Sequence, residues 1–265
     1  MKERTVMTER SDMKGGGVHS PARVLLVIDQ PVLAEMVKFA LNHGVFVPRV
    51  AEDAHDAMVA LREWHPHLSL IDMDLYQGHL MDELGTLAPP SERPPVIALT
   101  RRGDLKTTLA AFDWGVDDLL TVPFSPEELL ARALAVMRRT YQTAVAFTPT
   151  IRLGELEIDI LNRRVRAGTS ELHLTPLEQN LLYLLAANAG RLLTRDEILD
   201  TLWGVDYLAD SNVVDRHIRN LRAKLQNSWR RPRYIATIPG QGYQFIPTDT
   251  GEGATLAPRA ISQEG

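Results

Sequence analysis

The chain has 265 residues, of which 45% are hydrophobic and 24% charged, a composition typical of a globular protein with room for two domains. It contains no cysteine, which excludes disulfides, thiol catalysis and cysteine-based zinc sites. No apolar run approaches the roughly 18 residues of a membrane span, and residues 1–20 lack the apolar core of a secretory signal. We therefore expect a cytoplasmic protein with no membrane partner.

The net charge of −5 is unevenly distributed. Residues 22–139 hold 11 Lys and Arg against 17 Asp and Glu, a difference of −6, whereas residues 151–248 hold 13 against 11, a difference of +2. Within the second half, residues 216–233 include seven basic residues and no acidic one. An acidic half and a half with a basic stripe indicate two domains with different tasks.

The first half alternates strand and helix patterns after a polar segment, residues 1–21, that we predict to be a disordered tail. Strands are predicted at 23–28, 46–50, 68–74, 94–100 and 117–122. Helices are predicted at 31–44, 55–64, 104–115 and 125–139, and residue propensity gives least support to a further helix over 81–95. Ser125 is predicted to cap the helix at 125–139. This alternation predicts a doubly wound α/β domain with a five-stranded parallel sheet over residues 22–139.

Polar residues follow several of these strands. Asp29, Asp72 and Thr100 come at the ends of the first, third and fourth strands, and Val122 at the end of the fifth. Because the carboxyl ends of parallel strands meet at one edge of a sheet, we expect a site there. Strand-end aspartates also cap turns, but the convergence of three polar strand ends favours a site.

The second half begins with residues 140–150, which have no charge and no clear period and are predicted to be a linker. Strand-like pieces follow at 151–159, 163–168 and 171–175, with helices at 175–190, 195–204 and 212–227. Thr175 and Glu178 have the spacing of a capping box at the start of the first of these helices. The segment 233–247 reads as a hairpin around Pro-Gly-Gln-Gly, and residues 249–265 as a disordered tail.

The helix predicted at 212–227 is amphipathic. Its apolar stripe contains Val213, Val214, Ile218, Leu221 and Leu225, and its other face contains Arg216, Arg219, Asn220, Arg222 and Lys224. Two helices with a basic second member, followed by a hairpin, are typical of a winged helix-turn-helix domain, which we predict as an α+β unit over residues 151–248. Most basic helices are only solvated surface, but Asn and Arg together on one face suit bidentate base contacts.

At this point the sequence resembles a known family. From about Arg23 to Pro247 the chain is similar to the OmpR/PhoB family of bacterial response regulators, most specifically in VVDRHIRNLRAKL and RYIATIPGQGYQF. The resemblance implies a receiver domain of the flavodoxin/CheY-like fold, a linker and a winged-helix DNA-binding domain. It implies a transcriptional regulator and not an enzyme, since no nucleophile–base pair, glycine-rich phosphate loop or zinc spacing is visible.

Several family positions of the receiver are kept. The resemblance assigns Asp72 as the phosphoryl acceptor and Thr100 as the switch hydroxyl. The family's pair of acids that holds Mg²⁺ reads Ile28-Asp29 here, so one acid is missing. Asp29, Asp72 and Asp74 could still hold Mg²⁺ weakly, although we expect the Asp74 side chain to face solvent; no cofactor is required.

Other family positions are changed. A small residue is replaced by Arg101, an aromatic residue by Leu119, a lysine by Val122, and a proline beyond the acceptor by Tyr76. Loss of the lysine and of one acid weakens the neutralisation of charge that phosphoryl transfer needs. The Arg101 guanidinium either pairs with Asp72 or Asp29 or extends into solvent, and both alternatives stay open.

For the DNA-binding half, the resemblance assigns base contacts to Arg216 and Asn220, with Arg219 nearby, and phosphate contacts to Arg222 and Lys224. His217 is predicted to be a packed residue. The remaining predicted contacts to the DNA backbone are Trp203, Thr194, Thr237 and Tyr243. Pro239 stands where the family often has a minor-groove arginine, and we expect Arg231 and Arg233 to supply the missing charge.

The resemblance also implies partners. They are double-stranded DNA, RNA polymerase through the loop at Gly204 to Ser211, a second copy of the chain through the receiver, and a histidine kinase, whose involvement the altered receiver leaves open. The charges expected at the dimer contact are matched by Asp117, Glu128 and Arg132, whereas Lys106 and Thr108 replace others.

Three functions follow. The preferred one is a DNA-binding transcription regulator with a degenerate receiver that ordinary aspartyl phosphorylation does not switch. An alternative is slow phosphorylation at Asp72 in an ordinary phosphorelay. In the third, the receiver binds a small molecule or a protein and controls the DNA-binding half.

Overall fold

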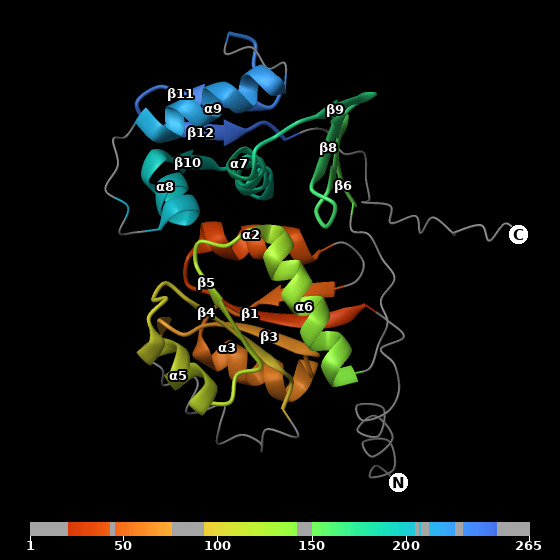
Figure 1. The fold of residues 1–265 in the computed structure, drawn as a ribbon, viewed down its shortest axis with the longest axis vertical. Coiled ribbons are helices and arrows are strands. Elements are labelled where there is room, and N and C mark those ends of the chain that lie inside the picture. Colours follow the sequence, from red (N-terminus) through yellow and green to blue (C-terminus); the bar gives the residue numbers. More distant parts are fainter. Residues whose placement is uncertain are drawn as a thin grey trace, which may run out of the picture.

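The computed structural model describes residues 21–42, 46–75, 93–141, 150–204, 207, 212–225 and 230–247 (Figure 1). The predicted tails, all but the ends of the predicted linker, most of the helix expected over 81–95, Tyr76 and most of the loop after Gly204 lie outside these residues. Among the described residues no helix is long and apolar enough to cross a membrane.

The first half is a five-stranded parallel sheet in the order β2-β1-β3-β4-β5, which confirms the predicted fold class. The strands are β1 (Ala22–Val27), β2 (Phe46–Val50), β3 (Leu68–Asp72), β4 (Val96–Thr100) and β5 (Asp118–Thr121). Pro48 is tolerated in β2 because this strand lies at the edge of the sheet.

Helices cover both faces of the sheet (Figure 1). They are α2 (Pro31–Leu41), α3 (Ala54–Val59) with a π-helical continuation η2 (Ala60–Trp64), α5 (Leu105–Asp113) and α6 (Pro126–Tyr141). Alternate residues of β1 enter different cores: Val24 and Leu26 pack with α2 and α6, whereas Leu25 and Val27 pack with α3 and α5. The expected helix cap at Ser125 is confirmed, because its Oγ accepts a hydrogen bond from the Glu128 N–H at 3.2 Å.

The second half begins with an antiparallel sheet in the order β6-β7-β8-β9, and a second sheet has the order β10-β12-β11. The strands are β6 (Thr150–Leu153), β7 (Leu156–Asp159), β8 (Arg164–Ala167), β9 (Ser170–Leu172), β10 (Leu192–Thr194), β11 (Ile235–Ile238) and β12 (Gly242–Phe245). Three helices accompany them: α7 (Pro176–Ala187), α8 (Arg195–Trp203) and α9 (Asn212–Lys224). α8, α9 and the β11–β12 hairpin form the predicted winged helix-turn-helix.

Both ends of the predicted linker differ from the prediction. Helix α6 runs to Tyr141, so the first two residues of the predicted linker belong to that helix, and Thr150 already belongs to β6.

The strand β10 was not predicted. It pairs with β12 so closely that a Cβ on Gly242 would overlap the Leu193 carbonyl oxygen, which explains the glycine at this position of the hairpin.

Candidate functional site

The Arg101 guanidinium lies inside the acidic pocket at the carboxyl edge of the parallel sheet. Its Nη2 donates a hydrogen bond to Asp29 Oδ1 at 3.3 Å, and its Nη1 lies 3.1 Å from Asp72 Oδ2 and 3.8 Å from Asp74 Oδ2. The contact to Asp72 is an ion pair without hydrogen-bond geometry. Of the two alternatives that the sequence left open, the structure shows the pairing with the carboxylates.

Asp74 was predicted to face solvent, and this was wrong. Its carboxylate is partly buried, and Oδ2 accepts a hydrogen bond from the Arg101 backbone N–H at 2.9 Å. The side chain is drawn inward because the backbone and the guanidinium of Arg101 both present positive ends to it. The Asp74 backbone N–H in turn donates a hydrogen bond to Asp72 Oδ1 at 3.0 Å, which links the two acidic residues.

Asp72 is the most buried of the three acids, with 2% of its side chain exposed. Burial raises the pKa of Asp72 above its ordinary value, although the Arg101 cation and the Asp74 N–H both favour the charged form. A nearby guanidinium therefore only partly offsets the cost of placing this carboxylate in the core.

The three carboxylates do not fit a Mg²⁺ ion in this arrangement. Mg²⁺ requires oxygen ligands in a near-octahedral shell, but the Arg101 guanidinium lies among these oxygens. Over the part of the chain that the structure describes, no group of three acidic or histidine side chains could hold a metal ion. The predicted weak site at Asp29, Asp72 and Asp74 is thus not formed as predicted.

The remaining pocket positions are apolar or turned away from Asp72. Val122 is buried in the core, and Leu119 packs against the core on the α3 and α5 side of the sheet. Thr100 is fully buried, and its Oγ1 accepts a hydrogen bond from the Arg102 N–H at 3.0 Å. Among the described residues, the cations within ion-pair distance of these acids are Arg101 and, at 3.9 Å from Asp74, Arg102; no lysine is among them.

The basic helix α9 presents part of its predicted contact face to solvent. Arg216, Arg219 and Asn220 are exposed, whereas Val214, Ile218 and Leu221 are buried against the rest of the domain. This is the division of faces that the sequence predicted. The three exposed side chains are placed where a groove of DNA could reach them.

Two predicted phosphate ligands are bonded within the protein. The Arg222 guanidinium donates from Nη2 to the Ile235 carbonyl at 2.9 Å and to Thr237 Oγ1 at 2.8 Å. The Lys224 ammonium lies 2.6 Å from Glu178 Oε2. These bonds fix α9 to the hairpin and to the start of α7. Both residues therefore position α9, the helix that is predicted to contact base edges and is called the recognition helix below.

The Glu178 carboxylate is bonded by two residues, Thr175 and Lys224. It closes the capping box of α7 by accepting a hydrogen bond from the Thr175 N–H at 2.8 Å, as the sequence predicted. Burial by itself raises the pKa of Glu178, but the bonds from Lys224 and Thr175 outweigh it and lower the pKa below its ordinary value. The charged pair therefore persists at neutral pH.

A second internal network fixes the other end of α9. Asp215 Oδ1 accepts hydrogen bonds from Arg195 Nε at 2.8 Å and from the Tyr243 hydroxyl at 2.7 Å. Burial alone raises the pKa of Asp215, but these two bonds outweigh it and lower the pKa. The Tyr243 hydroxyl, predicted to touch phosphate, donates its proton to Asp215, and Arg195 and Asp215 were not singled out from the sequence.

The other predicted DNA contacts also divide into exposed residues and residues that have a partner within the chain. Thr194 caps α8 and is exposed, Thr237 is exposed, and Arg231 is exposed beside the hairpin. Arg233 pairs with Glu155 at 2.6 Å and so does not stand free to replace the wing arginine.

The last two predicted positions are Trp203 and His217, whose ring centroids lie 5.6 Å apart in an aromatic cluster with Tyr207. Burial lowers the pKa of His217, which agrees with a packed neutral side chain.

Comparison with known proteins identifies both halves. A family profile of the response regulator receiver domain matches residues 24–134, and a profile described as transcriptional regulatory protein, C terminal, matches residues 169–245. The chain is 34% identical over 225 residues to the DNA-binding response regulator MtrA of Mycolicibacterium smegmatis, covering 85% of this chain and 97% of that protein. The chain belongs to the OmpR/PhoB family of DNA-binding response regulators.

The chain is also similar to two further OmpR/PhoB proteins. The phosphate regulon transcriptional regulatory protein PhoB of Escherichia coli is 36% identical over 225 residues, which cover 84% of this chain and 97% of PhoB. The crystal structure of DrrB, a Thermotoga maritima OmpR/PhoB homologue, is 28% identical and covers 85% of this chain and 99% of that chain, with a TM-score of 0.38. Members of this family bind DNA, are regulated by histidine kinases and often dimerise.

Proposed function

We propose that this OmpR/PhoB regulator binds its DNA sites without being switched by aspartyl phosphorylation. The observation that carries the proposal is the Arg101 guanidinium, which bonds to Asp29 and lies within ion-pair distance of Asp72 and Asp74. A cation that belongs to the chain stands where a metal ion and a lysine would otherwise neutralise the acids. The guanidinium therefore already occupies the acid pocket, and partly offsets the charge of the acids, before any phosphoryl group arrives.

The loss of the other phosphate ligands supports the same proposal. Val122 and Ile28 are buried apolar side chains at the positions of the lysine and the second acid. Phosphoryl transfer depends on positioned charge, and one missing donor at such a site commonly costs about 100-fold or more in rate. Slow phosphorylation at Asp72 and a ligand-binding receiver are the two competing functions, and no described contact favours either.

Intact-mass spectrometry after incubation with acetyl phosphate and Mg²⁺ tests the proposal. We expect the chain to keep its unmodified mass, because Asp72 is buried beside a guanidinium and has no lysine to bind the incoming phosphoryl oxygens. An Asp72→Asn variant gives the background. Stoichiometric labelling that disappears in Asp72→Asn would establish the ordinary phosphorelay instead.

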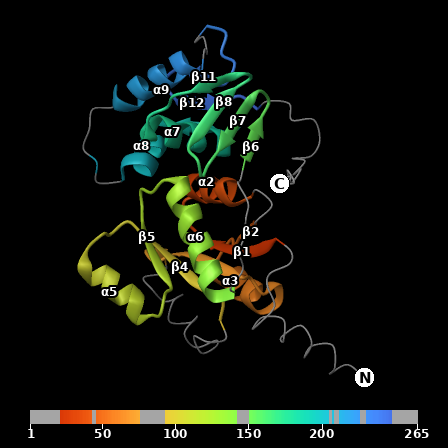
Figure 2. The same cartoon turned by 45° about the vertical axis from the view of Figure 1, so that its right-hand side comes forward.

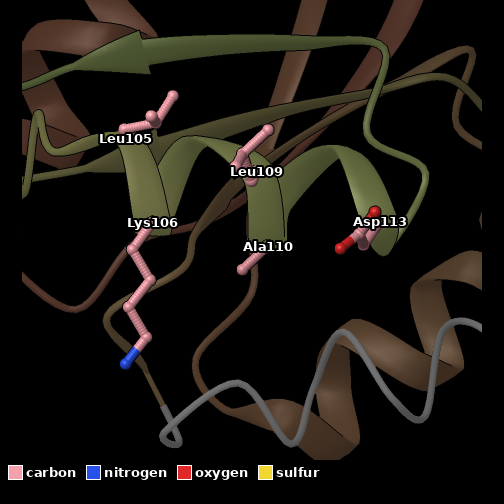
Figure 3. Close-up of a pocket in the computed structure, with 5 residues that line it drawn as sticks. All are labelled: Leu105, Lys106, Leu109, Ala110 and Asp113. Carbon is pink, nitrogen blue, oxygen red and sulfur yellow. The ribbon is translucent and has the colours of Figure 1, made fainter.

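We also propose that two copies associate through the receiver, chiefly by apolar contact. Leu105, Leu109 and Phe112 lie at positions i, i+4 and i+7 of α5 and are 72%, 56% and 50% exposed. In Figure 3, Leu105 and Leu109 project from one side of α5, whereas Lys106 and Ala110 project from the other; all four line a shallow pocket together with Asp113. Three exposed large apolar residues on one short helix mark an interaction surface.

The charges next to this surface are already paired within the chain. Arg132 forms ion pairs with Asp118 at 3.1 Å and with Glu128 at 2.9 Å, and the Asp117 carboxylate accepts a hydrogen bond from the Val96 N–H. The charged residues at the family's dimer contact, Asp117, Glu128 and Arg132, are thus already engaged within the same chain. This favours an association that depends on α5.

Sedimentation equilibrium tests the apolar contact. We expect Leu109→Glu to weaken self-association by about tenfold or more, the value of one buried leucine side chain. Val47→Glu is the matched control, because it replaces another exposed apolar side chain by the same acid on β2, at the opposite edge of the sheet from β5. Equal effects of the two variants, or none from Leu109→Glu, would exclude this surface.

The remaining partners are proposals that rest on the family. The loop from Gly204 to Ser211 is the candidate contact for RNA polymerase, and a histidine kinase is a candidate partner of the receiver. A cytoplasmic location and the absence of enzymatic activity are likewise proposed from the relatives MtrA and PhoB.

A further inference from the structure

The receiver and the DNA-binding half are in contact through the helix α2. In both Figure 1 and Figure 2, α2 lies between the receiver sheet and the second half, and its residues contact α7 and α8. The apolar cores of the two halves form one connected cluster, which includes Leu33 of α2 and Leu181 of α7. The contact between the halves is therefore apolar and continuous with both cores.

Helix α2 is apolar over more of its surface than a receiver needs. A helix that covers one sheet face buries a stripe of about 100°. The side chains buried in α2 span about 200° at 3.6 residues per turn. They are Val32, Leu33, Ala34, Met36, Val37, Ala40 and Leu41. Helix α6 of the receiver covers part of this additional apolar surface, and α7 and α8 of the DNA-binding half cover another part.

Helix α7 is buried on all sides in the same way. Six consecutive residues, 181–186, are each at most 3% exposed, and six consecutive positions point in every direction around a helix. Helices α8 and α9 and the strand β12 contact α7 within its own half, and α2 contacts it from the receiver. Without α2, one side of α7 would be an exposed apolar strip.

An ion pair joins the two halves next to this apolar contact. Glu127, in the first turn of α6, lies 2.8 Å from Arg163, in the turn between β7 and β8. Only 12% of the Glu127 side chain is exposed. A carboxylate buried to this extent is costly without its cation, and the Arg163 side chain, although 47% exposed, offsets part of that cost.

A third contact involves the turn that follows β5. A Cβ placed on Gly204, at the end of α8, would lie 3.6 Å from Pro123 Cδ, so the two backbones are in close approach. Pro123 directly follows Val122, the residue in the place of the family lysine. The edge of the receiver that carries the altered pocket thus also borders the DNA-binding half.

The recognition helix lies away from this junction. Helix α9 packs on α7 and α8, and in both views it is on the far side of its domain from the receiver (Figures 1 and 2). Its exposed residues Arg216, Arg219 and Asn220 are therefore not covered by the receiver.

We propose that the contact of α2 with α7 and α8, together with the Glu127–Arg163 pair, is a permanent joint that makes the two halves one rigid body. The receiver then acts as a fixed support that leaves α9 uncovered, whatever the state of the acid pocket. This inference goes beyond the proposed function, since it concerns the orientation of the domains and not phosphate chemistry.

Differential scanning calorimetry of the full chain, together with NMR relaxation of both halves, tests the joint. We expect the parent chain to unfold in one transition and its two halves to share one rotational correlation time. In Arg163→Glu, two carboxylates meet at the joint, so we expect two separate transitions and a shorter correlation time for each half. The double variant Glu127→Arg, Arg163→Glu should return both quantities toward the parent values.

Arg164→Glu is the matched control, since it makes the same change of charge one residue along the chain at an exposed position. Arg163 has a φ of 54°, and Glu at this position carries the same backbone strain as Arg, so the substitution adds no backbone strain. Two transitions or two correlation times in the parent chain would overturn the proposal. So would equal behaviour of Arg163→Glu and Arg164→Glu. Labelling of Asp72, which decides the proposed function, affects neither result.

Discussion

A chain that carries Arg101→Ala, Ile28→Asp and Val122→Lys together is expected to accept a phosphoryl group at Asp72. The first change removes the guanidinium from the acids, the second restores the missing carboxylate, and the third restores an ammonium beside the acceptor. Charged groups aimed at a transferring phosphoryl group contribute about 100-fold or more each. We therefore expect labelling by acetyl phosphate and Mg²⁺ to rise by at least this factor over the parent chain, measured by intact mass.

Adding Asp72→Asn to this variant is the control, and it should abolish the labelling. Arg101→Ala alone should label less than the combined variant, because the lysine and the second acid are still missing. Since Ile28 and Val122 are buried, the stability of the combined variant is checked by its urea midpoint before labelling. A folded combined variant that stays unlabelled would contradict our account of why the parent pocket is inert.

Arg216→Ala and Asn220→Ala are each expected to lower the affinity for a specific DNA site while changing non-specific binding less. Both side chains are exposed on α9, and a bidentate contact to a base contributes about 1–3 kcal/mol of discrimination. A duplex enriched from a random DNA pool supplies the specific site. Titrations of this duplex and of a scrambled duplex give the specificity ratio.

Arg231→Ala is the control for this experiment. This residue is exposed beside the hairpin, and we expect it to contact phosphate only. Its loss should weaken both duplexes about equally and reduce the salt dependence by about one unit. If Arg216→Ala and Asn220→Ala behave like Arg231→Ala, α9 does not read bases through these two residues.

Local sequence pattern was sufficient for most of the fold. The apolar runs of β1 and β3, the Ser125 cap and the Thr175 capping box were predicted because each depends on neighbouring residues. The strand β10 was missed because Leu192–Thr194 is too short to show an alternating pattern. The π-helical end of the helix that follows β2 leaves no recognisable signal in the sequence.

The positions of side chains in the two sites were less predictable. Lys224 and Glu178 are 46 residues apart, and Asp215 and Tyr243 are 28 apart, so no local pattern links them. A basic residue on a recognition helix looks the same in sequence whether it contacts DNA or an acid of its own domain. Helix α2 did carry a signal, because its apolar arc is wider than one sheet face requires.

The affinity of the chain for its specific DNA site, measured before and after incubation with acetyl phosphate and Mg²⁺, tests the central claim most directly. We predict that the two dissociation constants agree within about twofold, and that Asp72→Asn binds as the parent does, because α9 is uncovered and Arg101 occupies the acid pocket. A gain of about tenfold or more with the phosphodonor, absent in Asp72→Asn, would show that the receiver is an ordinary phosphorylation switch.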